Sequence, residues 1–178
     1  LKLSRGLGDV YKRQGWTGTH TTMNYLDEIV PILKELEKTH AFTFRVISNQ
    51  APSFELKSLE FVKWNKKTEI EDLAKINIGV MPLTDTIWAK GKCGFKGLQY
   101  MALEIPSVMS PVGVNTTIIE QEKNGFLCAS KEEWKKTLIQ LLESEELRLK
   151  IGKAGKETVM KSYSVNANRE NYLKLLNA

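Results

Sequence analysis

Residues 92–115 of the chain read KCGFKGLQYMALEIPSVMSPVGVN. The pattern predicts a glycine-containing loop, a short amphipathic helix over 94–103, a tight turn and a buried strand over 107–110. A second loop of small residues, PVGVN, follows that strand. Lys92 and Lys96 stand at the start of the expected helix, where free backbone N–H groups and the helix dipole favour an anion. The stretch therefore predicts a site for a phosphate or diphosphate.

Strands and helices alternate along the rest of the chain. Further strands are expected at 42–47, 59–64, 78–83 and 125–129, and the run IGVMPL at 78–83 is typical of a strand buried on both faces of a parallel sheet. Helices are expected at 23–38, kinked at Pro31, at 68–76, with a capping box of Thr68 and Glu71, and in the closing part of the chain. The alternation predicts an α/β fold, a Rossmann-like doubly wound parallel sheet that binds ligand at the carboxyl edge of its strands.

Composition narrows the class of protein. The chain has 178 residues, of which 42% are hydrophobic and 26% charged, and this describes a folded domain with a sizeable core. The net charge of +5 is spread without an arginine-rich tract, so we expect no nucleic-acid partner; a phosphate-bearing ligand or anionic lipid fits the sign. Two distant cysteines argue for a reducing compartment and against zinc. With no signal peptide and no apolar run of about 20 residues, the cytoplasm is the expected location.

The first residues do not fit the pattern that follows. Residues 1–14, LKLSRGLGDVYKRQ, show neither alternation nor helical periodicity and resemble a translated read-through artefact. We expect them to be a non-native leader; a native disordered arm is the alternative. The first strand would then have been cut short before GWTG, and residues 15–178 would be the carboxy-terminal half of a longer protein.

A second phosphate-binding loop is expected at 15–22, GWTGTHTT, where a strand end opens into small and hydroxyl residues. Gly18, Thr19 and His20 are the candidate contacts. The alternative is a plain strand-to-helix turn with capping threonines. A lone histidine in such a turn is more often structural or solvated than a ligand contact.

The segment QYMALEIPSV at 99–108 resembles the nucleotide-sugar-binding motif of family 4 (group 1) glycosyltransferases, which have the GT-B fold. The GWTG loop, the IGVMPL strand and the Tyr163-Ser164 tail with its closing helix extend this resemblance over 15–178. It implies the donor domain of a hexosyltransferase-type enzyme: retaining, metal-independent transfer from a nucleotide diphosphate sugar, without a cofactor, to a glycan or lipid-linked acceptor. Cell-envelope or capsular polysaccharide synthesis is the usual setting. Residues 163–178 would pack on a missing amino-terminal acceptor domain, which could contact the membrane surface peripherally.

The resemblance also assigns roles to residues. Lys96 would approach the diphosphate, supported by Lys92, and the loop holding Val114 and Asn115 would face the donor phosphates. Gln99 stands where an acidic residue usually holds the sugar or ribose hydroxyls, so no catalytic residue is certain in this half.

Other positions of the pattern leave open alternatives. Glu104 replaces the usual glycine of the turn and would be strained there. Trp64 could cover the base or simply pack at the end of its strand. Trp88 and Asp85 could lie beside the sugar, and the basic loop 90–96 could be no more than a solvated face.

These departures keep two other functions open. One is a sugar-nucleotide epimerase of the same architecture, and the other is a nucleotide-binding or scaffold module without catalysis. In the preferred interpretation the chain alone binds the donor but is nearly inactive.

Overall fold

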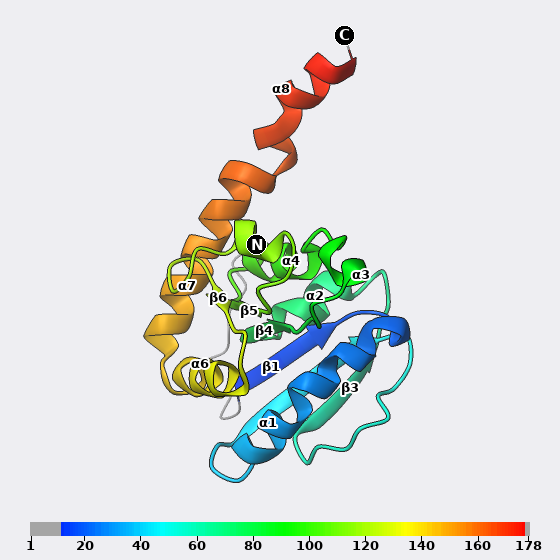
Figure 1. Ribbon diagram of the computed structural model, residues 1–178, viewed down its shortest axis with the longest axis vertical. Coiled ribbons are helices and arrows are strands. Elements are labelled where there is room, and N and C mark those ends of the chain that lie inside the picture. Colours follow the sequence, from blue (N-terminus) through cyan, green and yellow to red (C-terminus); the bar gives the residue numbers. More distant parts are fainter. Residues whose placement is uncertain (1–11, 177–178) are drawn as a thin grey trace.

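The computed structural model describes residues 12–176 (Figure 1). Six parallel strands form one sheet in the order β3-β2-β1-β4-β5-β6. The strands are β1 (Lys12–Thr17), β2 (Phe42–Ser48), β3 (Leu59–Lys63), β4 (Ile78–Met81), β5 (Ser107–Met109) and β6 (Phe126–Leu127). The sheet and its flanking helices confirm the predicted Rossmann-like α/β fold.

Helices cover both faces of the sheet. They are η1 (His20–Glu28), α1 (Val30–Leu36), α2 (Glu69–Ala74), α3 (Ile87–Lys90), α4 (Phe95–Ala102), α5 (Asn115–Ile118), α6 (Lys131–Glu143), α7 (Glu145–Thr158), the π-helix η2 (Val159–Tyr163) and α8 (Val165–Leu176). On one face α1 and α6 pack on the largest core cluster, to which α6 contributes Trp134, Leu138, Leu141 and Leu142. On the other face α2 and α4 meet over β2 and β4, and Figure 1 shows the sheet between the two layers.

The strand order reverses between β1 and β4. From β1 the chain winds outward through β2 to β3, and it then returns to β4 and winds the other way to β6. In such sheets a crevice opens at the carboxyl ends of the two strands where the order reverses. Here these ends are Thr17 of β1 and Met81 of β4.

Pro31 does not kink one long helix over 23–38, as the sequence predicted. The segment is a 3₁₀ helix, η1, followed by α1, and Pro31 lies in the first turn of α1. A proline is tolerated there because the first N–H groups of a helix have no partner within the helix. Several predicted strands are shorter than expected, and the segment between β4 and α4 contains the short helix α3.

The predicted capping box of Thr68 and Glu71 is wrong, because the Thr68 side chain caps no backbone N–H of α2. A capping box does begin α6. There the Ser130 hydroxyl accepts from the Glu133 N–H at 3.2 Å, and the Glu133 carboxylate accepts from the Ser130 N–H at 3.0 Å.

The described fold begins before Gly15, where the leader was expected to end. Residues 12–14 form the first half of β1, whereas residues 1–11 lie outside the described part. Gln14 pairs with Phe44 on one side and Ile78 on the other and is fully buried. Neither its amide nitrogen nor its oxygen has a hydrogen-bond partner within residues 12–176. A strand position suited to an apolar side chain is therefore occupied by a polar one.

The closing helix α8 projects away from the body of the domain (Figure 1). The Ser164 hydroxyl caps it by accepting from the Ala167 N–H at 3.1 Å. Tyr172, Leu173 and Leu176 are 65%, 40% and 81% exposed, so this helix leaves apolar side chains uncovered.

Candidate functional site

Three loops meet at the crevice between β1 and β4. A Cβ at Gly18, after β1, would lie 3.0 Å from Cε of Lys96 at the start of α4. A Cβ at Gly94 would lie 3.3 Å from both Val114 and Asn115, in the loop after β5. Glycine at both positions leaves room for these neighbouring side chains. The loops predicted to bind phosphate are therefore neighbours in space.

Lys96 is a half-buried cation on the inner side of this crevice. Its Nζ lies 5.7 Å from the centre of the Trp16 ring. Burial lowers the pKa of the Lys96 ammonium below its ordinary value, and the nearby Lys92 ammonium lowers this pKa further. Among residues 12–176 no carboxylate forms an ion pair with Lys96. The site therefore holds positive charge that a bound anion could neutralise.

Lys92 supplies a second ammonium, held by aromatic rings. Its Nζ lies 5.4 Å from the centre of the Tyr25 ring and 5.9 Å from that of Trp88. Lys90, the third lysine of the segment, instead pairs with Asp85 at 3.1 Å. The predicted basic loop thus separates into one neutralised lysine and two that face no carboxylate in the described structure.

Tyr100 fixes α4 relative to the first loop. Its hydroxyl accepts a hydrogen bond from the Thr17 N–H at 3.1 Å and donates to the Val80 carbonyl at 3.4 Å. The side chain is fully buried, and burial raises the pKa of its phenol well above the ordinary value. Gly79 makes room for the ring, because a Cβ there would lie 2.3 Å from Tyr100. The helix that carries Lys96 is thereby held against the ends of β1 and β4.

His20 begins η1 directly after Gly18 and Thr19, and its ring Nε2 has no hydrogen-bond partner among residues 12–176. Its backbone N–H donates to Oδ1 of Asn49 at 2.9 Å, which fixes that amide so that Nδ2 faces Nδ1 of the His20 ring at 2.9 Å. Because an amide NH₂ can only donate, the neutral ring carries its proton on Nε2. Thr19 beside it is exposed, and its hydroxyl bonds to that of Thr21 at 2.7 Å.

Gln99 meets a residue that sequence reasoning missed. Its Nε2 donates to Oε1 of Glu69, the first residue of α2, at 3.3 Å. The two residues are 30 positions apart on different helices, so no local spacing linked them. The structure thus places a carboxylate beside Gln99, which itself carries no charge.

The loop after β5 was predicted to face the donor phosphates, and its side chains are held within the fold. The side chain of Asn115 is buried and its amide nitrogen donates to the Ser110 carbonyl at 2.9 Å, so this side chain shapes the loop. Val114 packs against Gly94 and offers only backbone groups. Gly113, at φ 57°, lies so close to the Lys90 backbone that a Cβ would be 2.7 Å from its carbonyl oxygen.

The two tryptophans expected near the ligand are both accessible. Trp64 is 42% exposed just after β3, where its N–H donates to the Ser48 carbonyl at 2.8 Å. Trp88 is 76% exposed and lies near Lys92. Asp85 is held by Lys90, and this pairing competes with its predicted contact to sugar hydroxyls.

Glu104 has the strained backbone that the sequence predicted, with φ 58°. Its carboxylate pairs with Nζ of Lys156 on α7 at 2.7 Å. A Cβ at Gly152 of α7 would lie 2.1 Å from the Glu104 carbonyl oxygen, so the turn is fixed by close packing.

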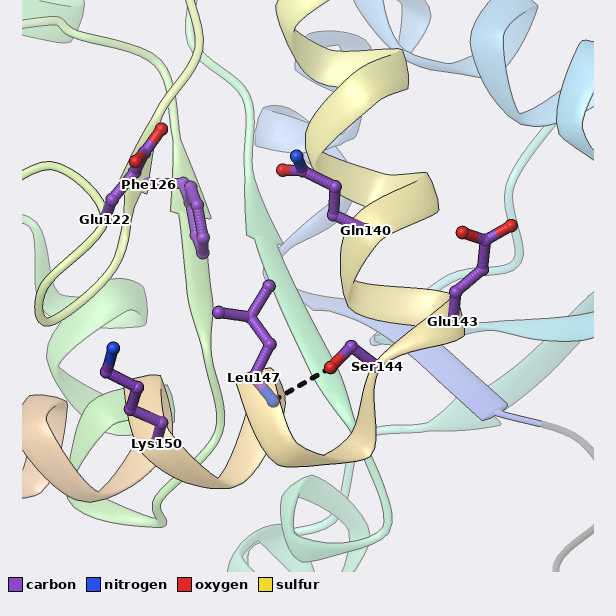
Figure 2. Close-up of a pocket in the computed structure, with 7 residues that line it drawn as sticks. All are labelled: Glu122, Phe126, Gln140, Glu143, Ser144, Leu147 and Lys150. Carbon is purple, nitrogen blue, oxygen red and sulfur yellow. Dashed lines mark hydrogen bonds between the residues drawn. The ribbon is translucent and has the colours of Figure 1, made fainter.

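A separate pocket of about 440 Å³ lies among β6, α6 and α7 (Figure 2). Glu122, Glu143 and Lys150 all line it, and Glu143 lies across the pocket from Lys150. Two carboxylates against one ammonium disfavour a diphosphate there. Within residues 12–176 no group of three or more potential metal-ligating side chains is assembled, and no helix is both long and apolar enough to cross a membrane.

Comparison with known proteins identifies the family to which the chain belongs. The family model for "Glycosyl transferases group 1" matches residues 43–158, and the chain belongs to this family. A search of curated protein sequences found no match.

Solved structures agree on the fold. S. aureus TarM is 16% identical with a TM-score of 0.73, over 94% of this chain and 36% of its own. The C-terminal domain of the group 1 glycosyl transferase LpcC from Francisella tularensis is 20% identical with a TM-score of 0.65, over 87% of each chain. Anabaena Alr3699/HepE is 13% identical with a TM-score of 0.74, over 94% of this chain and 48% of its own. The chain thus spans about a third to a half of TarM and HepE, and nearly all of the LpcC domain.

Proposed function

We propose that this chain is the donor domain of a glycosyltransferase and binds the diphosphate of a nucleotide sugar between the Gly18 loop and the start of α4. The observation that carries the proposal is the pair of lysines, Lys92 and Lys96. Both lie at the crevice where the strand order reverses, and neither faces a carboxylate in the described residues. Two adjacent, unneutralised ammoniums are costly unless an anion binds between them.

Structures of similar fold support this choice of anion. TarM was solved with UDP, and HepE with UDP and glucose. In this proposal His20 Nε2 and the backbone N–H groups of the Gly18 and Val114 loops assist the two lysines. Exposed Trp64 offers a surface for the nucleobase.

The proposed chemistry is electrostatic. When the bond between sugar and diphosphate breaks, negative charge grows on the leaving diphosphate. Fixed positive groups therefore stabilise the transition state, in which this charge develops, more than they stabilise the ground state. Lys96 and Lys92 would supply this stabilisation at a site that Tyr100 and Gly79 hold rigid. We extend the proposal to the retaining, metal-independent chemistry of family 4, since two ammoniums can provide the positive charge that a metal would otherwise bring.

The acceptor side is proposed to come from a second domain. The chain spans only part of TarM and HepE, and α8 leaves Tyr172, Leu173 and Leu176 uncovered. The acceptor would be a glycan or lipid-linked sugar of the cell envelope, met at the cytoplasmic surface of the membrane. This chain alone would bind the donor without transferring sugar.

Calorimetric titration with UDP, GDP and ADP in the presence of EDTA tests the proposal. We expect one of them to bind, and Lys96→Ala to weaken it by about tenfold or more, since a hydrogen bond between charged groups is worth roughly 1.5–3 kcal/mol. Lys90→Ala is the matched control, because Lys90 is already paired with Asp85. Absence of binding by all three, or equal binding by the Lys96 variant, would refute the proposal.

A further inference from the structure

The carboxylate of Glu69 accepts a hydrogen bond from the side-chain amide of Gln99 and does not pair with a cation in the described structure. Gln99 Nε2 donates to it at 3.3 Å, whereas Asp72, in the same helix, pairs with Lys75 at 3.2 Å and lies 4.0 Å from Arg45. Glu69 is half-buried and forms no ion pair among residues 12–176. A carboxylate in this setting keeps acceptor capacity for neutral donors such as hydroxyl groups.

The pair lies one helical turn from the proposed diphosphate site. Gln99 follows Lys96 by three residues on α4, and residues at this spacing share a helix face. Lys96 contacts the Gly18 loop, while Gln99 reaches across to Glu69 at the start of α2. A diphosphate on Lys96 would therefore bring the group attached to it toward Glu69. In a nucleotide sugar both attached groups, the ribose and the transferred sugar, carry vicinal hydroxyls.

We propose that Glu69 and Gln99 form a diol site, in which the Glu69 carboxylate accepts hydrogen bonds from two neighbouring hydroxyls of the ligand. Gln99 holds the carboxylate in place and can exchange a hydrogen bond with one hydroxyl. A carboxylate has two oxygens with which it can accept two such bonds, and bonds to a charged acceptor are about twice as strong as neutral ones. The specificity residue would thus come from α2, not from α4. This inference rests on the proposed function.

The test compares a nucleotide that has the diol with one that lacks it. Whichever of UDP, GDP and ADP binds the chain is titrated beside its 2′,3′-dideoxy analogue and its glucose conjugate. The proteins are wild type, Glu69→Gln and the control Glu71→Gln, which removes an exposed carboxylate from the same helix turn. We expect Glu69→Gln to lower the affinity for the parent nucleotide by about tenfold and to leave the affinity for the dideoxy analogue unchanged. By charge alone, loss of a carboxylate would strengthen the binding of an anion, so weakening identifies hydrogen bonding.

The outcomes separate the two proposals. If Glu69→Gln binds the nucleoside diphosphate itself more weakly than wild type does, ribose occupies the site. If only the glucose conjugate binds more weakly, the transferred sugar occupies it. If Glu69→Gln binds every ligand like wild type, or weakens the dideoxy analogue equally, the diol site is refuted while donor binding through Lys96 stands. If wild type binds no nucleotide, the proposed function fails, and the diol site fails with it.

Discussion

The phenolic oxygen of Tyr100 accepts a hydrogen bond from the Thr17 N–H at 3.1 Å and thereby joins α4 to the end of β1. Thr17 directly precedes the Gly18 loop, and Tyr100 is one turn from Lys96. One buried hydroxyl therefore sets the distance between the two halves of the proposed diphosphate site.

Tyr100→Phe should destabilise the domain by about 1–3 kcal/mol, because it leaves the buried Thr17 N–H without its acceptor. Urea denaturation measures this difference. Tyr163→Phe, at an exposed position, is the control and should change nothing. We also expect Tyr100→Phe to bind nucleotide more weakly than wild type in the absence of urea. Unchanged stability would show that the hydroxyl does not hold the two elements together.

Lys96→Met should stabilise the chain without ligand by about 0.5–2 kcal/mol while abolishing nucleotide binding, as expected where function is kept at a cost in stability. The reason is that the ammonium is half-buried beside Lys92 and has no carboxylate partner in the described structure. Thermal or urea unfolding, with and without nucleotide, measures both effects. If the variant is less stable than wild type, the packing of the Lys96 side chain stabilises the fold by more than its buried charge destabilises it.

The pH dependence follows from the lowered pKa of Lys96. An anion binds the charged form, so nucleotide affinity should fall as pH rises through this pKa, below the range of an ordinary lysine. In the window between the lowered pKa and the ordinary value of 10.5, the unfolded chain binds more protons than the folded one, so stability without ligand should rise with pH there. Lys92→Gln removes one cause of the shift and should move the fall in affinity to higher pH. Affinity that stays constant through alkaline pH would contradict this assignment.

Gln14→Leu should stabilise the fold by about 1–3 kcal/mol, since burial of an amide without a hydrogen bond carries a penalty of this size. Gln14 lies between the buried side chains of Phe44 and Ile78 and has no partner in the described chain. Gln140→Leu, at an exposed position of α6, is the control for added apolar surface. A loss of stability in Gln14→Leu would show that this amide is satisfied in solution.

Glu104→Gly should raise the free energy of unfolding by about 1 kcal/mol, because glycine adopts the left-handed backbone conformation at φ 58° without strain. The same change removes the pair with Lys156, which is half exposed and worth less than about 1 kcal/mol. Lys156→Ala removes the pair alone, so comparing urea midpoints of the two variants isolates the backbone contribution. Equal destabilisation of both would mean that the turn carries no strain.

The sequence could predict what depends on neighbouring residues. The amphipathic run 94–103, the glycine before it and the two lysines lie within one short segment, so α4 and its cations were visible in the local pattern. The fold class followed from the regular alternation of strands and helices. The strain at Glu104 followed from a glutamate in a turn that usually holds glycine.

The remaining features depend on contacts between distant residues. Nothing near Gln99 indicates that Glu69 lies beside it, because the two helices meet only once the sheet is wound. The sequence also did not indicate that the Asn115 amide donates to the Ser110 carbonyl and so shapes the loop after β5. Lys90 and Lys92 look alike in sequence, and only the fold pairs the first with Asp85 and surrounds the second with aromatic rings.

A crystal structure of this chain with the nucleoside diphosphate that binds it tests the central claim most directly. The account predicts the diphosphate within hydrogen-bond distance of Lys96 Nζ, between the Gly18 loop and α4, with its ribose or sugar toward Glu69. A nucleotide bound elsewhere, such as in the pocket among β6, α6 and α7, with Lys92 and Lys96 uncontacted, would contradict it.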